Sequence, residues 1–521
     1  MTRPDAVVCS ASRVLTTTRS SSGLSTVLVA VDTVVTSPFR FEFSKRHAYK
    51  GATTAACRRG CQTDLVAIST LPWRVPVRNI SPAHAARQTT GHGGTTVAIS
   101  EHTAAFHALL TPPGQRLLDS VDPAEVTNDP LRAASRLRRS PDASDEAFED
   151  LGVPGSDVVQ AALTQARLRG RAREKFGEAA RRMYFTSTGL EQATRRRVAE
   201  YRAGRLAAGL GAGARVADLG CGIGADLLSM AEAGLRVDGV DADPFTVAVA
   251  SANISARGLT ERARAHQADA VELTAAVRDY DAVFSDPARR GARGRVFDPG
   301  AYSPPWDTVV ALARTAPAAC VKTAPGIPHE LIPTDAGAEW VSVGGEVKEA
   351  TLWFGTLDAA ERRATLLRGD DAPATLTADP TLGTPDIAAP RRYLYEPDGA
   401  VVRAHLVAEA AASLDGALLD PNIAYITSDR LVDTPLCRAL EVHEVLPFSL
   451  KRLRAALRER RVGTVTIKKR GSAVDVDKLR RDLKPTGPET AVVVLTRIGE
   501  RPISLLCSEV TGSASGDVGK A

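Results

Sequence analysis

Three glycines at alternating positions constrain the fold of this chain more than any other feature. The segment Gly220-Cys221-Gly222-Ile223-Gly224 follows an apolar run at 216–219 and precedes a run of helical character at 225–233. Glycine tolerates positive φ and lets a ligand approach the backbone without a Cβ in the way. The segment therefore predicts a sharp turn from a buried strand into a helix.

Strands and helices alternate from residue 214 onward, which predicts a parallel sheet with helices on both faces, an α/β domain over 211–369. A hairpin, 340–343 with 350–354, is predicted to close it. The other predicted strands are 216–219, 236–241, 263–268, 281–285 and 319–323, and the predicted helices are 225–233 and 245–256.

Acidic residues lie at the ends of three predicted strands, namely Asp218, Asp241 and Asp269. The carboxyl ends of parallel strands meet at one edge, so these side chains should surround the glycine turn. The glycine spacing is GxGxG, whereas a dinucleotide fingerprint has GxGxxG. Asp241, about twenty residues after the turn, could accept hydrogen bonds from both hydroxyls of a ribose.

These residues resemble the cofactor motifs of class I, Rossmann-like S-adenosylmethionine (SAM)-dependent methyltransferases over about 214–355. The resemblance implies that Gly220, Gly222, Gly224 and Asp241 hold SAM. Asp218 would favour its cationic end, and Asp269 would meet the adenine amino group. Other interpretations are a tight turn without a ligand, a nicotinamide or flavin site, and acids that only cap a helix or strand.

The fourth strand leads into Asp286-Pro287-Ala288-Arg289-Arg290. Family members that methylate exocyclic amines of bases carry here an acid, Asn or Ser, then two prolines and an aromatic residue. In this chain Ala288 and Arg289 replace the second proline and the aromatic. We predict that Asp286 and Pro287 orient the acceptor, and that Arg289 and Arg290 stack on a base or hold phosphate. An ordinary strand-end turn is the alternative.

Three further residues could lie near this site. Trp306 follows Ser303-Pro304-Pro305 and would either stack on substrate or begin a helix. Lys322 ends the fifth strand and would either meet substrate phosphate or be a solvated lysine. Cys320 is expected to be buried, which disfavours chemistry that needs an exposed nucleophilic thiol.

Residues 391–510 are predicted to form a separate α+β domain whose final strand is 491–496. Within 446–486, thirteen Lys or Arg stand against four acids, including Lys468-Lys469-Arg470 before Gly471. Basic helices at 449–461 and 476–483 beside this loop suit an RNA backbone, although a solvated basic face is also possible. The arrangement resembles the THUMP-like domain that follows a methyltransferase domain in a family of bacterial proteins. It implies a structured RNA partner, a tRNA or rRNA.

Composition and hydrophobic pattern predict the structure of the remaining segments. Residues 1–100 hold four acids against twelve Lys or Arg. They are predicted to be a disordered or mis-called extension, with a transit-like leader as alternative. Residues 101–210 are predicted to be helical, with Ser187 or Thr188 capping a helix that runs to 211 and Glu191 completing a capping box. A linker is predicted at 370–390 and a disordered tail at 511–521.

Several classes of protein are disfavoured. No segment has about 18 uninterrupted apolar residues, so no membrane span is expected. The seven cysteines are scattered, and the pair Cys57 and Cys61 has no partners for zinc. We expect a cytoplasmic RNA methyltransferase without a metal. The alternatives are a protein or small-molecule methyltransferase, and an RNA-binding protein whose methyltransferase domain is inactive.

Overall fold

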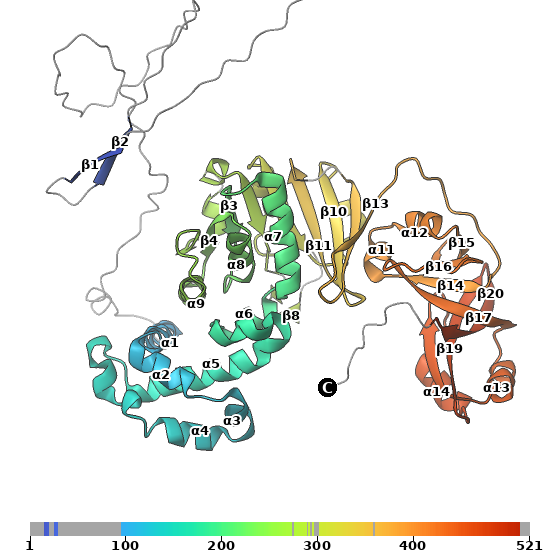
Figure 1. Ribbon diagram of the computed structural model, residues 1–521, viewed down its shortest axis with the longest axis horizontal. Coiled ribbons are helices and arrows are strands. Elements are labelled where there is room, and N and C mark those ends of the chain that lie inside the picture. Colours follow the sequence, from blue (N-terminus) through green and yellow to red (C-terminus); the bar gives the residue numbers. More distant parts are fainter. Residues whose placement is uncertain are drawn as a thin grey trace, which may run out of the picture. The chain divides into compact units, whose positions relative to one another are not determined.

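The computed structural model describes residues 15–19, 25–29, 95–273, 276–288, 290–291, 294–295, 302–357 and 360–510. The chain divides into two units, residues 1–92 and 93–521. In the first unit, β1 (Leu15–Arg19) pairs with β2 (Ser25–Val29) in antiparallel fashion (Figure 1). Cys57, Cys61 and the predicted tail at 511–521 lie outside the described residues.

A nine-stranded sheet forms the α/β part of the second unit, which confirms the predicted fold class (Figure 1). Its order is β13-β12-β10-β11-β9-β6-β3-β4-β5. The five strands from β9 to β5 are parallel, whereas β11 is antiparallel to both β9 and β10. The strands are β3 (Arg215–Leu219), β4 (Arg236–Asp241), β5 (Ala263–Gln267), β6 (Ala282–Ser285), β9 (Ala318–Thr323), β10 (Ala336–Val343), β11 (Glu346–Gly355), β12 (Arg362–Leu367) and β13 (Ala374–Thr377).

The topology fixes where a ligand can bind. The chain runs from β3 through α8 (Ala225–Glu232) to β4, through α9 (Pro244–Ala256) to β5, and then returns to β6 on the other side of β3. Strand order reverses at this point, and open α/β sheets bind ligands in the crevice at the carboxyl ends of the strands there. At the opposite edge of the sheet, β13 occupies part of the segment predicted as a linker.

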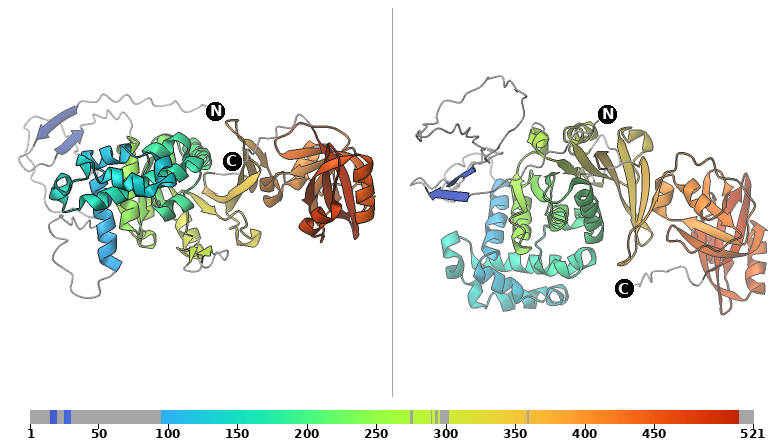
Figure 2. Two further views of the ribbon diagram at one scale, coloured as in Figure 1. Left: turned by 90° about the horizontal axis from the view of Figure 1, so that it is seen from below. Right: turned by 45° about the horizontal axis from the view of Figure 1, so that its top comes forward.

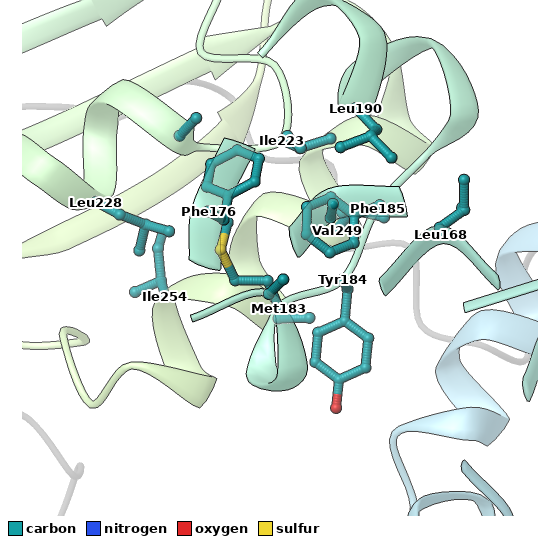
Figure 3. Packing of buried hydrophobic residues seen from close by; sticks show 14 of the residues in the cluster. Leu168, Phe176, Met183, Tyr184, Phe185, Leu190, Ile223, Leu228, Val249 and Ile254 are labelled. Atoms are coloured by element: carbon teal, nitrogen blue, oxygen red, sulfur yellow. The ribbon is translucent and has the colours of Figure 1, made fainter. Parts of the chain in front are cut away.

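The helical region precedes the sheet and shares its core. It contains α1 (Thr95–Leu109), α2 (Pro112–Asp119), α3 (Pro123–Asn128), α4 (Pro130–Leu137) and α5 (Gly155–Phe176). One hydrophobic cluster joins this region to α8 and α9. Figure 3 shows Phe176, Met183 and Leu190 packed with Ile223, Leu228 and Ile254. The helical region and the α/β sheet are therefore parts of one folded body.

The helix predicted to run from 187 towards 211 is broken, so this prediction is wrong in detail. α6 (Ser187–Gln192) is capped by Thr186, whose hydroxyl oxygen accepts from the Gly189 N–H at 2.8 Å. Ala193 then has extended dihedral angles, and α7 (Arg196–Leu210) begins after Arg195. The short segment 193–195 between the two helices lies near the end of β3.

The C-terminal part is a seven-stranded sheet with order β15-β16-β14-β17-β20-β19-β18. Figure 2 shows this part in orange to red. Its last strand is β20, not the predicted 491–496, which lies inside β19. The helices α13 (Leu450–Glu459) and α14 (Val476–Leu483) pack on it through leucines. The strands are β14 (Tyr393–Pro397), β15 (Ala417–Asp420), β16 (Ile423–Ser428), β17 (Cys437–Pro447), β18 (Val462–Lys469), β19 (Glu489–Ile498) and β20 (Arg501–Glu509), and two short helices are α11 (Gly399–Arg403) and α12 (Val407–Ser413). In the described parts of the chain, no helix is long and apolar enough to cross a membrane.

Candidate active site

A cavity of about 450 Å³ lies at the carboxyl ends of β3, β4, β5 and β6. Its size is in the range of pockets that hold a cofactor-sized ligand. Among the described residues, its lining contains no Lys, Arg or His but six acids: Glu191, Asp218, Asp226, Asp241, Asp269 and Asp286. The cavity is therefore suited to a cationic ligand and unfavourable for an anion.

The glycine turn forms the floor of this cavity. Gly220, Gly222 and Gly224 have φ of 87°, 56° and 85°, values that other residues rarely adopt. The turn is joined to β4 because the Gly222 N–H donates to Asp241 Oδ2 at 3.1 Å. The other oxygen of Asp241 accepts from the Asp243 N–H at 3.0 Å. These bonds hold the Asp241 carboxylate beside the turn.

Asp218 is fully buried at the end of β3, and it lines the cavity. Neither carboxylate oxygen has a hydrogen-bond partner among the described residues. Burial, with the nearby charges of Asp226 and Asp286, raises the pKa of Asp218 well above its ordinary value. A buried ionised carboxylate without a partner is costly, so a donor or a cation bound in the cavity would stabilise the ionised form of Asp218.

Asp286 also lines the cavity, directly after β6 and close to the glycine turn, since a Cβ on Gly220 would lie 3.7 Å from its carbonyl oxygen. The next residues are held in place because Ala288 and Ser303 exchange two backbone hydrogen bonds, of 2.8 and 3.0 Å. Behind Asp286, the Lys322 ammonium forms an ion pair with its Oδ2 atom. Pro287, Ala288 and Ser303 complete this side of the lining.

Residues 189–194 form a wall of the cavity that the sequence did not predict. Gly189 touches the glycine turn so closely that a Cβ on it would lie 2.4 Å from Ile223 Cγ2. Lys175 on α5 donates to the carbonyls of Leu190, Glu191 and Ala193 at 2.7, 2.7 and 3.0 Å. Its pKa is lowered to about 8 by burial and by the charges of Arg195 and Lys322. The wall is thus fixed by a residue far back in the helical region.

A buried set of charges lies beneath the wall. Arg202 on α7 is 2 % exposed and forms ion pairs with Asp226 and, at 2.7 Å, with Glu349 on β11. Burial raises the pKa of Asp226, but the charges of Arg202 and Lys322 outweigh this effect and lower it. The Thr194 hydroxyl donates to the same carboxylate at 2.8 Å. These contacts connect the helical region, the start of α8 and the centre of the sheet.

Some predicted site residues are not where the sequence suggested. Trp306 begins α10 (Trp306–Ala313), is 7 % exposed and donates to the Leu331 carbonyl at 3.2 Å, which contradicts a stacking role. Lys322 is 5 % exposed and does not line the cavity, which contradicts direct contact with substrate phosphate. Cys320 is fully buried, and burial raises the pKa of its thiol. Arg289 and the side chain of Arg290 lie outside the described residues.

The predicted basic loop of the C-terminal sheet is occupied by contacts within its own domain. Lys468 forms an ion pair with Glu396, and Lys469 donates to the Val474 carbonyl at 3.1 Å. Arg470 donates to the Ala424 carbonyl at 2.7 Å. These three side chains are therefore less available to a partner than the sequence suggested.

Comparisons with known proteins agree with this geometry. A methyltransferase domain family matches residues 216–289, a THUMP domain-like family matches 437–509, and a domain of unknown function matches 102–147. Two relatives, each described as an uncharacterized SAM-dependent methyltransferase, come from two strains of Mycobacterium tuberculosis. Each is 37% identical over 352 residues, which is 65% of this chain and 92% of the relative.

One solved structure, described as a putative methyltransferase from Porphyromonas gingivalis, has a similar fold. The TM-score is 0.59 at 20% identity, and the match covers 81% of this chain and 100% of that chain. At this identity the likeness concerns the fold alone.

Proposed function

This chain belongs to the SAM-dependent methyltransferases, and from that premise we propose that it methylates an exocyclic amine of a base in structured RNA, a tRNA or an rRNA. SAM is its methyl donor, and supplies an electrophilic methyl group on a positively charged sulfur. The observation that carries the RNA assignment is the presence of the THUMP domain-like segment at 437–509 in the same chain as the acid-lined cavity.

The unpartnered carboxylate of Asp218 supports binding of the cationic amino-acid end of SAM next to the glycine turn. Asp241 is proposed to bind the ribose. Both of its oxygens already accept a backbone N–H, but each keeps a second lone pair for a hydroxyl. Asp269 also lines the cavity, and with one oxygen bonded to the Val271 N–H at 2.9 Å it is the candidate for the adenine amino group.

We expect Asp241→Ala to weaken SAM binding about a hundredfold, because two charge-assisted hydrogen bonds of about 1.5 kcal/mol each are lost. Titration calorimetry with SAM measures the effect. Asp238→Ala is the matched control, since Asp238 lies on the same strand but accepts from the Tyr280 hydroxyl at 2.8 Å and does not line the cavity. Wild-type affinity in a folded Asp241→Ala protein would remove Asp241 from the site.

SAM binding should release a proton from Asp218. Burial raises the pKa of this group in the free protein, whereas a bound cation favours the ionised form. Between the ordinary pKa and the raised one, affinity should therefore increase with pH, by up to about tenfold per pH unit. Calorimetry in two buffers of different ionisation enthalpy detects the released proton. The Asp218→Asn protein should bind SAM without releasing this proton. Equal proton release from wild type and Asp218→Asn would refute the role proposed for Asp218.

The acceptor side of the cavity supports an amine. Asp286 can accept an N–H from the amine and so direct the nitrogen lone pair towards the methyl group. When the N–C bond forms, the bond from the methyl carbon to sulfur would break and the sulfur would leave as a neutral thioether. The nitrogen would then carry a surplus proton, which the Asp286 carboxylate can accept and pass to water. Because six acids line the described cavity, a phosphate or carboxylate acceptor would be repelled.

Exposed cations on the C-terminal domain support an RNA partner. The buried face of α13 is formed by Leu453, Ala456 and Leu457, and α14 packs beside it. Their outer faces carry the exposed residues Lys451, Arg452, Arg458, Lys478 and Arg481. We propose that these helices contact the phosphate backbone, with Lys468, Lys469 and Arg470 in a supporting role. Arg289 and Arg290, which follow the cavity-lining Ala288 in the sequence, remain candidates for holding the base.

Incubating the purified protein with methyl-labelled SAM and total RNA from a deletion strain tests the proposal. We expect label in one nucleoside of tRNA or rRNA, identified by mass spectrometry, and no label in RNA from the parent strain. Label found only in protein or small molecules would identify another class of methyltransferase. Salt-dependent RNA binding without SAM affinity would identify an inactive methyltransferase domain.

A further inference from the structure

A buried lysine is placed directly behind the acceptor side of the cavity. Lys322 lies on β9, and β9 is the parallel neighbour of β6, with Ser285 opposite Val321. The register therefore sets Lys322 beside Asp286. The Lys322 ammonium contacts Asp286 Oδ2, and the two side chains are 7% and 24% exposed. The cation is thus enclosed, whereas the carboxylate still reaches the cavity.

The ammonium has a second partner that belongs to the cavity wall. It donates to the Thr194 hydroxyl oxygen at 2.9 Å, and that hydroxyl donates to Asp226 Oδ2 at 2.8 Å. Asp226 lies in the first turn of α8, directly after the glycine turn. Lys322 therefore connects the carboxylate on the acceptor side to the helix that begins on the donor side.

We propose that Lys322 is a positioning residue, whose ammonium fixes Asp286 through one carboxylate oxygen and leaves the other, Oδ1, to accept the N–H of the acceptor amine. This rests on the proposed function, because it assigns Asp286 to the amine. No hydrogen bond to Oδ1 is found among the described residues, so this oxygen is available. A carboxylate held in one orientation directs the amine better than a freely rotating one.

The surrounding charges support this role. Asp286 is flanked by Lys322 on β9 and lies near Asp218 on β3, while Lys322 also faces Asp226 on α8 and Lys175 on α5. Among the described residues, the cation in contact with the Asp286 carboxylate is Lys322. The nearby Asp218 carboxylate, when ionised, repels it. Without Lys322, the Asp286 carboxylate would lose its ion-pair partner among the described residues.

The variants are Lys322→Met, which removes the charge, and Lys322→Arg, which keeps it. Lys348→Met is the matched control. Lys348 lies on the neighbouring strand β11, pairs with Glu346 at 2.6 Å, and is partly buried. We expect Lys322→Met to lower kcat for methylation of deletion-strain RNA about a hundredfold, while KM for SAM changes less than about threefold. The kcat of Lys322→Arg should be at least about tenfold higher than that of Lys322→Met, and the kcat of Lys348→Met should match wild type.

Rescue by a conservative variant distinguishes positioning from mere support of the fold. The kcat should fall in Lys322→Met and recover in Lys322→Arg, whereas both variants should unfold at similar temperatures. An equal loss of kcat in Lys322→Met and Lys322→Arg would refute the positioning role. Thr194→Val removes the second partner of the ammonium, and should lower kcat to a smaller extent.

A second measurement needs no acceptor. In protein labelled with ¹³C at the aspartate carboxyls, the Asp286 signal is identified by its loss in Asp286→Asn. At neutral pH its chemical shift should differ between Lys322→Met and wild type, because the ammonium no longer contacts the carboxylate, and should be unchanged in Lys348→Met. If wild type methylates no RNA, the proposed function fails, but this signal still decides whether Lys322 holds Asp286. An unchanged signal in Lys322→Met refutes the inference even if RNA is methylated.

Discussion

Replacing Asp286 with alanine is expected to lower kcat for RNA methylation about a thousandfold, while the affinity for SAM stays within a fewfold of wild type. The carboxylate lines the cavity beside Pro287, and the Lys322 ammonium holds it by an ion pair. Without it, the amine loses its hydrogen-bond acceptor and its orientation. Single-turnover rates with labelled SAM, combined with calorimetry, separate the loss of chemistry from a loss of donor binding.

The Asp286→Asn protein refines this test. Its amide oxygen can still accept an N–H, but the amide carries no charge to pair with Lys322. We expect an intermediate rate, above that of Asp286→Ala and below that of wild type. Asp307→Asn on α10 is a control for the removal of a nearby acid that does not line the cavity. Near-normal turnover in a folded Asp286→Ala protein would show that another group orients the acceptor.

Replacing Arg202 with leucine is expected to lower the free energy of unfolding by about 3–5 kcal/mol, because two buried carboxylates would lose their ion-pair partner. Those carboxylates are Asp226 on α8 and Glu349 on β11. The pKa of Asp226 is lower in the folded protein than in the unfolded chain. Its stabilisation is therefore present above the unfolded pKa and is lost as pH falls through the folded one. Because Arg202→Leu lacks this contribution, its stability should approach that of wild type as pH falls through this range.

Arg196→Leu, on the same helix, is the matched control. Arg196 pairs with Glu200 at 2.7 Å, but both side chains are exposed, and such pairs contribute about 0–1 kcal/mol. Chemical denaturation followed by circular dichroism compares the two variants. Equal stabilities would mean that the buried network contributes nothing beyond what an apolar side chain provides.

The features that depend on neighbouring residues in the chain could be predicted from the sequence. The turn at 220–224 and the strands at 216–219, 236–241 and 281–285 follow from glycine spacing and apolar runs, and the structure has strands at these positions. The acids that end those strands were placed at one edge by the rule that parallel strands share a direction. Their common cavity follows from the same rule.

Contacts between distant residues could not be predicted in this way. Thr188 and Glu191 have the spacing of a helix start, yet α6 ends at Gln192. Lys175, fifteen or more residues earlier, donates to carbonyl oxygens at this helix end. Lys468 was expected to be free, but Glu396, 72 residues away, neutralises it. Lys322 was expected to face the substrate, and only the pairing of β6 with β9 reveals Asp286 as its partner.

The wall at 189–194 also affects how this protein could be shortened. The first strand of the nine-stranded sheet begins at Arg215, so a truncation just before it would keep the whole sheet. Such an excision would remove Gly189 from Ile223 and leave Asn253, which bonds to Tyr184 and to the Ile223 carbonyl at 2.9 Å, without one of its partners. The donor would then be open to bulk water on one side. Any transplant of this catalytic unit into another chain has to start no later than α5, at Gly155.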